Sequence, residues 1–461
     1  MIRLKDYTRL SDLEDYNKLK EFTDISDDNL EEKGFIDKED FLNRLCKINN
    51  QKIIIVPENV MYEGNIEIIS QYNGEYWTQN YVGFLEYNEE NIIISSRFEK
   101  NNSFNFTHYI LSEALELHAS IFPDMKIKVT KERILDELLA IVFINQIKYA
   151  YRKGIYRKYR TYTRNDSKIK GKIDIANHIR LNLIFNGNIA YSYREYTVDN
   201  DVNKLILTAY TFLEKRCGAF YKNLLRDKRD VVNYIAQLKN SIHPASPQEI
   251  KDLVKKVNKK IVHPIYKEWE AVRKTAIMIL RHMGVHMTET GDKEISGILI
   301  DMNKIWELYL EKIMRDLPNN IILKSQEQSH FLMLKEKVIK SIKPDFCFYK
   351  DSQKHPVLIL DAKYKNAWQK VADGSNADWP REDCFQLVTY MHILKCLRVG
   401  IVCPVDKEVE NDEVAFIWNN EGEQICVIPL EISQEEDMYM YIEDMREKEK
   451  KFISKVKRYL N

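Results

Sequence analysis

The sequence has no apolar run that approaches the length of a membrane span, and residues 1–6 contain no apolar signal-peptide core. We therefore expect a cytoplasmic protein with no membrane partner. Hydrophobic residues make up 44% of the 461 residues and charged residues 30%, as in soluble globular proteins. The length is sufficient for two or three domains, each with its own core.

Motifs that bind zinc or form disulfide frameworks are also lacking. The seven cysteines are an odd number and include no Cys-x-x-Cys pair, which argues against both a disulfide framework and a structural zinc site. Cys347 and Cys403 lie in apolar runs, and we interpret them as small core residues. No His-Glu-x-x-His motif is present, and the single histidine pair four apart, His282 and His286, is interrupted by Gly284.

The sequence contains no Gly-x-x-x-x-Gly-Lys-Ser/Thr loop, so this polypeptide does not bind a nucleotide through a P-loop. It also lacks an excess of either charge, because 70 Lys and Arg residues balance 70 Asp and Glu residues. Tight DNA binding depends on neutralising phosphates with basic side chains. A nucleic-acid surface would therefore be a local patch, or a partner would supply it.

One local patch is strongly basic. Residues 148–172 contain ten Lys or Arg residues against one acid, Asp166, with tyrosines interleaved. Contact with a DNA backbone, contact with a protein partner and a solvated helix end are three interpretations of this segment. The candidate DNA contacts are Lys153, Arg157, Lys158 and Arg160. Residues 180–193, centred on Asn186 and Gly187, predict a β-hairpin that follows this segment.

A second predicted hairpin carries the residues that suggest chemistry. Residues 343–349 and 357–363 are rich in aromatic and aliphatic side chains, with a polar, turn-like segment between them. Side chains alternate along a strand, so Asp361 and Lys363 point to the same side, where Asp345 from the neighbouring strand can join them. Two carboxylates and the Ala362 carbonyl suit Mg²⁺, with Mn²⁺ as a substitute.

Such a metal would polarise a phosphodiester and lower the pKa of a bound water molecule. Lys363 would orient that water or stabilise the charge that develops on phosphorus. The alternative is an ordinary surface salt bridge between Asp361 and Lys363.

Two flanking helices favour the catalytic interpretation. Residues 304–314 have helical spacing and include Glu307, and an apolar helix beginning near residue 383 places Gln386 and Tyr390 one turn apart. This order of helix, hairpin and helix is that of the PD-(D/E)xK nuclease core. The predicted catalytic residues are Asp345, Asp361, Lys363, Gln386 and Glu307, and the predicted metal ligands are Asp345, Asp361 and Glu307.

Several further segments resemble one nuclease family. They are residues 134–139, 152–159, 170–174 and 197–207. Together with the hairpin they resemble the McrC family, the nuclease subunits of McrBC-type modification-dependent restriction systems directed at 5-methylcytosine. The resemblance covers roughly residues 80–430. It implies a partner that is an McrB-like AAA+ GTPase hexamer, GTP used only through that partner, and a double-stranded DNA substrate carrying modified cytosine.

We therefore expect an α+β, multi-domain chain. The expected domains are a β-rich docking module at 1–105, a mainly helical region with the basic segment and hairpin at 106–290, and a PD-(D/E)xK endonuclease domain with a mixed sheet flanked by helices at 291–461. The expected function is the endonuclease subunit of a modification-dependent restriction complex. A self-sufficient RecB-like nuclease and a non-catalytic adaptor of a ring NTPase remain alternatives.

Overall fold

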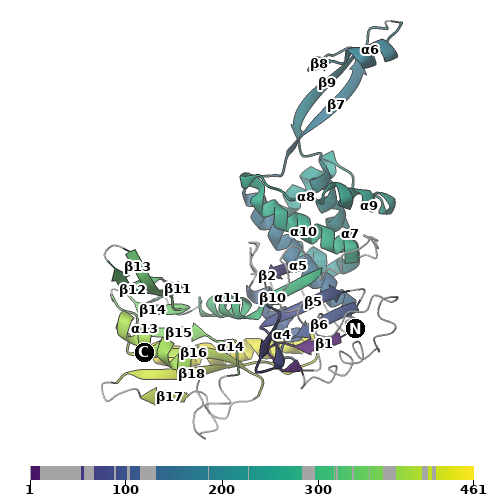
Figure 1. Cartoon of the computed structure of the whole chain (residues 1–461). Helices are drawn as coiled ribbons and strands as arrows, with labels where there is room; N and C mark the ends of the chain where they lie inside the picture. The colour runs from purple at the N-terminus through teal and green to yellow at the C-terminus, as the bar shows by residue number, and fades with distance from the viewer. Residues whose placement is uncertain are drawn as a thin grey trace. The chain divides into compact units, whose positions relative to one another are not determined.

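The computed structural model divides the chain into two compact units (Figure 1). The first unit comprises Met1–Glu58, Tyr62–Thr130 and Lys293–Asn461, and the second comprises Asn59–Met61 and Lys131–Asp292. The structure describes residues 2–10, 53–56, 67–87, 90–100, 104–114, 131–184, 186–226, 228–282, 296–315, 317, 320–334, 337–351, 353–366, 381–407, 414–417 and 422–460.

The first unit begins with a five-stranded sheet in the order β1-β6-β5-β10-β2. Its strands are β1 (Ile2–Lys5), β2 (Ile53–Val56), β5 (Tyr81–Tyr87), β6 (Glu90–Ser95) and β10 (Ser296–Asp301), and a separate hairpin is formed by β3 (Ile69–Tyr72) and β4 (Glu75–Thr78). β10 pairs antiparallel with β5 and parallel with β2. Gly297 permits this close pairing, because a Cβ atom there would lie 2.2 Å from the Phe84 carbonyl oxygen.

A second, six-stranded sheet of the same unit has the order β11-β14-β15-β16-β18-β17. The strands are β11 (Ile321–Ser325), β14 (Phe346–Lys350), β15 (Leu358–Ala362), β16 (Arg398–Val405), β17 (Val414–Ile417) and β18 (Gln424–Glu431), with a hairpin of β12 (Ser329–Leu334) and β13 (Lys337–Ile342) beside them. β15 pairs antiparallel with β14 and parallel with β16. The predicted hairpin and the mixed sheet that contains it are both confirmed.

Among the described residues of this unit, four helices are present. They are α4 (Asn105–Ala114), α11 (Met302–Met314), α13 (Arg381–Leu394) and α14 (Met438–Leu460). Leu387 and Met391 of α13 join Ile359, Val399 and other buried strand residues in one hydrophobic cluster. α11 contacts β15 and α14 contacts β18, so helices hold the six-stranded sheet in place, as expected. Cys347 and Cys403 are buried free cysteines, which confirms their assignment to the core.

The second unit is built mainly from helices. They are α5 (Lys131–Arg152), α7 (Asp201–Leu225), α8 (Arg229–Ser241), α9 (Pro247–Lys256) and α10 (Lys267–His282), with the 3₁₀ turn η4 (Pro264–Tyr266) before the last. Buried side chains such as Trp269, Tyr234 and Leu205 form its core. The Trp269 indole donates to the Gly154 carbonyl at 2.9 Å, which ties α10 to the chain just beyond α5.

A narrow three-stranded sheet extends from these helices (Figure 1), and we call residues 158–197 the arm. It contains β7 (Lys158–Asp166), β8 (Lys172–Ile173), α6 (Ile175–Leu181) and β9 (Ile189–Thr197). The prediction of a hairpin at residues 180–193 is wrong for the first of its two strands. β9 forms, but it pairs along its whole length with β7, and residues 175–181 form a helix whose first turn is capped by Asp174.

The chain is thus a mixed α/β protein with several sheets. Its two units differ from the three consecutive domains expected from the sequence, because residues 1–58 and 293–461 belong to one unit. β10 explains part of the difference: residues 296–301, expected to open the nuclease domain, add a strand to the N-terminal sheet. Within the residues that the structure describes, no helix is both long enough and apolar enough to cross a membrane.

Candidate active site

Two acidic residues meet where β14 begins and β15 ends. Phe346 pairs with Leu360 in the antiparallel register, so Asp345 lies opposite Asp361. An Asp345 carboxylate oxygen accepts a hydrogen bond from the Ala362 amide at 2.8 Å. The hairpin register therefore brings together the two carboxylates that the sequence predicted.

Asp361 and Lys363 form a close ion pair, with 2.6 Å between Lys363 Nζ and Asp361 Oδ2. The side chain of Asp361 is only 4% exposed and that of Lys363 is 21% exposed. The pair is therefore not an ordinary surface salt bridge, because desolvation makes such a pair costly and its geometry specific. The Lys363 amide donates to the Val402 carbonyl at 2.9 Å, which continues the parallel pairing of β15 with β16 beyond the last strand residue.

α13 supplies an amide that contacts both members of this pair. Gln386 Oε1 accepts from Lys363 Nζ at 2.8 Å, and Gln386 Nε2 lies 3.5 Å from Asp361 Oδ1. Tyr390, one helical turn further, has its hydroxyl 2.6 Å from Gln386 Nε2 and 3.4 Å from Asp361 Oδ1. The predicted Gln-x-x-x-Tyr face is thus turned toward Asp361 and Lys363.

One acidic residue of α13, Asp383, was not assigned to the site from sequence. Asp383 lies 3.7 Å from Lys363 Nζ and also pairs with Lys365. Its signal in the sequence was its position three residues before Gln386, which places it on the same helix face. Lys363 is consequently held by two carboxylates and one amide.

Glu307 projects from α11, whose N-terminus is capped by the Asp301 side chain. Its carboxylate contacts Lys304 Nζ at 3.1 Å and the Gln326 amide. Gln326 Nε2 also lies 3.3 Å from Asp345 Oδ1, so Gln326 connects Glu307 to Asp345. Sequence reasoning missed Gln326 because it follows β11 and carries no local motif.

The pKa of Asp345 is raised to about 7, chiefly by burial and then by the neighbouring charges of Asp361 and Glu307. Burial acts to lower the pKa of Lys363, but the attraction of Asp361 and Asp383 outweighs it and the pKa is raised. Lys363 therefore stays an ammonium at neutral pH. A cation near Asp345 would stabilise the ionised form of its carboxyl group.

These side chains line a pocket of 390 Å³ in the first unit. The pocket residues are Tyr7, Asn80, Arg97, Asn303, Glu307, Lys343, Asp345, Asp361, Ala362, Lys363, Tyr364, Lys365 and Gln386. All five predicted catalytic residues are among them. Tyr7, Asn80 and Arg97 come from the N-terminal sheet and its flanks, and no sequence pattern linked them to the site.

The candidate DNA contacts lie in the second unit and do not line this pocket. Lys153 follows the end of α5, Arg157 precedes β7, and all four side chains are exposed. The guanidinium of Arg160 pairs with Asp199. The basic segment is thus a helix end followed by a strand of the arm.

The donor set around the two aspartates fits a hard cation. Carboxylate oxygens are the ligands that Mg²⁺ prefers, and it commonly takes only one or two of them while keeping several waters. Among the described residues, no three His, Cys, Asp or Glu side chains form a ready group for a metal ion. A pair of carboxylates such as Asp345 and Asp361, with water completing the shell, would fit such a cation.

Comparison with known proteins gives a family match and several structural likenesses, including two to chains of Thermococcus gammatolerans complexes. A chain in the refined half-complex of Thermococcus gammatolerans McrB AAA+ hexamers with bound McrC is 16% identical, with a TM-score of 0.47 over 99% of each chain. A chain of the cryo-EM Thermococcus gammatolerans McrBC complex is 15% identical, with a TM-score of 0.30 over 68% of this chain and 87% of that one.

None of the curated proteins compared with the sequence matches it. The model of the family described as McrBC 5-methylcytosine restriction system component matches residues 77–404. That range includes Asp345, Asp361, Lys363 and Gln386. The family match confirms the resemblance drawn from the sequence, and the chain belongs to the McrBC 5-methylcytosine restriction system components.

Proposed function

We propose that this chain is the endonuclease subunit of a modification-dependent restriction complex and hydrolyses DNA phosphodiesters with Mg²⁺ at a PD-(D/E)xK-type site. The observation that carries the proposal is the group formed by Asp345, Asp361 and Lys363 at the end of β15, half-buried in a pocket. Paired carboxylates beside a fixed ammonium are suited to metal-assisted phosphoryl transfer.

Asp345 and Asp361 are the proposed metal ligands. The two side chains lie opposite each other, and the pKa of Asp345 is raised partly by the charge of Asp361. A divalent cation would reduce this repulsion. When bound, the metal would polarise the phosphoryl group and lower the pKa of a coordinated water molecule. Glu307 remains a proposed third ligand; in this arrangement its carboxylate contacts Lys304 and Gln326, which would have to release it.

Lys363 acts as a charged hydrogen-bond donor in this proposal. Its raised pKa keeps the proton on the ammonium, so it does not serve as the base. It would orient the attacking water or stabilise the charge that builds up on the phosphoryl oxygens. Gln386 holds Lys363 and Asp361 in register through its two amide atoms, and Tyr390 fixes Gln386.

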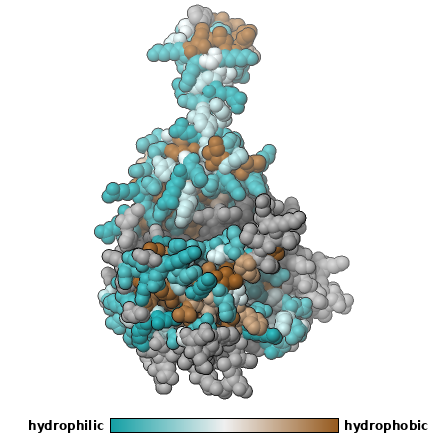
Figure 2. Space-filling model, turned by 90° about the vertical axis from the view of Figure 1, so that its left-hand side faces the viewer, coloured by the Kyte–Doolittle hydropathy of each residue, from teal (hydrophilic) through white to brown (hydrophobic). Residues whose placement is uncertain are grey.

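The proposed partner is an McrB-like AAA+ GTPase hexamer, which would supply all GTP chemistry. The chain belongs to the McrBC restriction system components, and its sequence has no P-loop of its own. The arm of the second unit offers a candidate docking element. Its tip carries exposed apolar side chains at Ile175, Ile179, Leu183 and Ile184, visible as brown atoms at the top of Figure 2.

Two other functions make different predictions. A self-sufficient RecB-like nuclease would cleave DNA in Mg²⁺ without any NTPase, and a non-catalytic adaptor would stimulate the ring without cleaving. The buried Asp361–Lys363 pair favours the catalytic readings over the adaptor. Burying an ion pair and a second carboxylate costs stability, and a scaffold gains nothing from it.

The decisive experiment is cleavage of methylated and unmethylated plasmid in Mg²⁺ by the chain alone, and with its AAA+ partner and GTP. The proposal requires cleavage of methylated DNA only in the full mixture, lost when Asp361→Ala replaces the wild type. Cleavage by the chain alone would establish the free-standing nuclease. Stimulated GTP hydrolysis without cleavage would establish the adaptor.

A further inference from the structure

Tyr364, the residue after Lys363, points away from the pocket-facing ammonium and into an aromatic cluster. It is 3% exposed, with its ring centroid 5.3 Å from that of Phe98 and 6.4 Å from that of Phe106. Its hydroxyl lies 2.7 Å from Ser96 Oγ. The ring is thus anchored by Ser96, Phe98 and Phe106, which follow β6 in the sequence.

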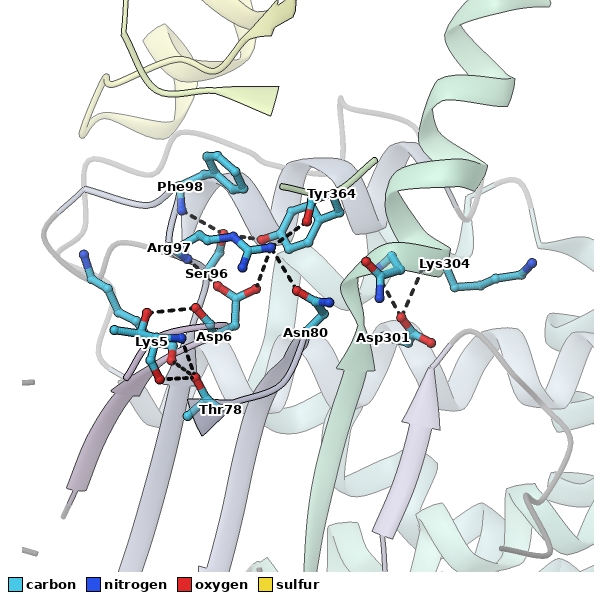
Figure 3. A network of polar contacts seen from close by, with 12 residues as sticks. Lys5, Asp6, Thr78, Asn80, Ser96, Arg97, Phe98, Asp301, Lys304 and Tyr364 are labelled. Atoms are coloured by element: carbon cyan, nitrogen blue, oxygen red, sulfur yellow. Dashed lines mark hydrogen bonds and ion pairs between the residues drawn. The ribbon is translucent and has the colours of Figure 1, made fainter. Parts of the chain in front are cut away.

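The backbone of Tyr364 is held by the same region (Figure 3). Arg97 Nη2 donates to the Tyr364 carbonyl at 2.6 Å and to Asn80 Oδ1 at 2.9 Å. The Arg97 amide donates to an Asp6 carboxylate oxygen at 2.6 Å, and its guanidinium lies 4.7 Å from the Tyr7 ring centre and 4.8 Å from that of Tyr364. A cation with this many fixed neighbours has little freedom to move.

We propose that Arg97 is a positioning residue for cleavage: it clamps the Tyr364 carbonyl so that Lys363 keeps its place beside Asp361 and Gln386. The inference rests on the proposed function, because it assigns Arg97 to the same site. It makes the N-terminal sheet part of the catalytic apparatus and not merely a docking module. The contact joins residues 267 positions apart in the sequence.

The surrounding hydrogen bonds explain why this clamp matters. Residue 363 lies beyond the last residue of β15, where regular strand pairing ends. On one side the Lys363 amide is fixed to the Val402 carbonyl, and on the other the Lys365 amide turns back to the Lys363 carbonyl. Without Arg97, the Tyr364 carbonyl would lose its charged partner, and the backbone of this turn would lose its hydrogen bond to the region after β6, although the Tyr364 ring would keep its contacts there.

Arg97 is poorly placed to bind DNA directly, although it lines the pocket. Its Nε and Nη1 atoms are buried without a hydrogen-bond acceptor, and Nη2 already serves two acceptors. The guanidinium carbon lies 4.7 Å from the ring centre of Tyr7 and 4.8 Å from that of Tyr364. A phosphate contact would require this arrangement to open. The geometry therefore favours an effect on the catalytic rate over an effect on DNA affinity.

The test uses the full chain with its AAA+ partner and GTP, and compares Arg97→Gln with Arg9→Gln. Arg9 also pairs with an acid in the N-terminal region, Glu75, but lies outside the pocket lining. We expect Arg97→Gln to lower kcat by about 10- to 100-fold, the effect of a misplaced catalytic group, while DNA affinity changes less than about 2-fold. Arg9→Gln should leave both unchanged.

Hydrogen exchange of the peptide spanning residues 358–366 gives a second readout that does not depend on cleavage. Exchange at the Lys363 and Lys365 amides should be faster in Arg97→Gln and unaltered in Arg9→Gln. If Arg97→Gln does not fold, Arg97→Lys replaces it. That variant keeps the charge with one donor group, and a smaller loss of kcat with faster exchange supports the clamp.

Weaker DNA binding with an unchanged kcat would overturn the proposal and make Arg97 a phosphate contact. Unchanged exchange at residues 358–366 in a folded Arg97 variant would also overturn it. Absence of cleavage by the wild type would instead contradict the proposed function. The exchange comparison would still decide whether Arg97 holds the Tyr364 segment.

Discussion

The pocket and the arm both gather cationic and aromatic side chains, but they use them differently. In the pocket, Lys363 is held by Asp361, Asp383 and Gln386 within a half-buried site. In the arm, cations lie over tyrosine rings, as the Arg194 guanidinium does over the exposed ring of Tyr159 at 5.2 Å. The first arrangement fixes one geometry, and the second leaves side chains accessible to a partner.

We interpret this difference as a separation of the proposed chemistry from the proposed recognition. A catalytic group must be held near its productive geometry, which justifies the cost of burying opposed carboxylates at Asp345 and Asp361. A contact surface needs accessible charge and apolar area instead, which the arm provides at its tip. Changes in the pocket should therefore alter rate, and changes in the arm should alter assembly or affinity.

The largest effect is expected from Asp361→Ala or Lys363→Ala. Each removes half of the buried ion pair, so cleavage should fall by at least about 10³-fold. Stimulation of the partner's GTP hydrolysis should persist, because the arm and the pocket belong to different units. Plasmid cleavage and GTP hydrolysis measured in the same mixture check both statements. The control is Lys354→Ala, which changes an exposed lysine in the turn of the same hairpin. Cleavage by Lys363→Ala at the wild-type rate would show that our site assignment is wrong.

Disruption of the arm tip should produce the next largest effect, on assembly. Leu183→Asp with Ile184→Asp places two charges on side chains that are 84% and 87% exposed, so folding should be unaffected. Affinity for the AAA+ ring should fall by about 100-fold, as when charges enter an apolar interface. Gel filtration with GTP measures the complex. Val232→Asp, on an exposed site of α8, should assemble normally, and normal assembly by the tip variant would exclude the tip as a docking element.

Gln386→Ala should reduce kcat by about 10-fold, because Lys363 and Asp361 each lose one supporting hydrogen bond but keep one another. Single-turnover cleavage separates this from an effect on DNA binding. Thr389→Ala on the same helix is the matched control, since its hydroxyl bonds only to the Phe385 carbonyl. An equal loss in both variants would indicate damage to α13 and not to the site.

The basic segment should have a smaller, salt-dependent effect. Lys153→Glu with Arg157→Glu should weaken DNA binding by about 10-fold at low salt and less as salt rises, if these side chains meet phosphates. Titration of DNA at several ionic strengths measures the slope. The matched variant Lys251→Glu with Lys255→Glu changes exposed lysines on α9. Equal behaviour of the two pairs would return residues 153–157 to the interpretation of a solvated helix end.

Local periodicity was sufficient to predict the central hairpin. Alternation along 357–363 placed Asp361 and Lys363 on one side, and helical spacing placed Gln386 and Tyr390 on one face, both of which the structure confirms. The same local reasoning wrongly predicted a hairpin around the Asn186–Gly187 turn. The structure of the arm is determined instead by the pairing of β7 with β9 along their whole length, and these two strands are not joined by a single turn.

Contacts between distant segments were not predictable in this way. Arg97 and Asn80 carry no motif, and each reaches the pocket only because the chain folds back over long sequence separations. For the same reason the pairing of β10 with β2 and β5 was not predicted. In it, residues 296–301 add a strand to a sheet whose other strands lie before residue 100. Gln326 also carries no motif; it contacts Asp345, a pocket residue 19 positions further along the chain. Sequence patterns define faces of elements, whereas tertiary packing decides which faces meet.

The smallest expected effect concerns stability, and it tests whether the pocket is costly to form. The pKa of Asp345 rises from 3.8 to about 7 on folding, so its contribution to stability is full below pH 3.8 and is lost as the pH rises through 7. Without metal, the free energy of unfolding should therefore fall over this range. Asp345→Asn should remove this fall and stabilise the metal-free protein at pH 8 by on the order of 1–2 kcal/mol, because solvent screens the partly exposed carboxyl.

Urea unfolding at several pH values, with and without Mg²⁺, measures this effect. Mg²⁺ should stabilise the wild type at pH 8 and have a weaker effect on Asp345→Asn, because a bound cation relieves the repulsion that the amide has already removed. Asp351→Asn, an exposed position at the far end of β14, should follow the wild type. The opposite outcome is a free energy of unfolding that changes with pH in the same way for the wild type and Asp345→Asn between pH 4 and 7. That result would show that folding does not raise the pKa of Asp345. The pocket would then not be costly to form, and the contrast with the accessible arm would be wrong.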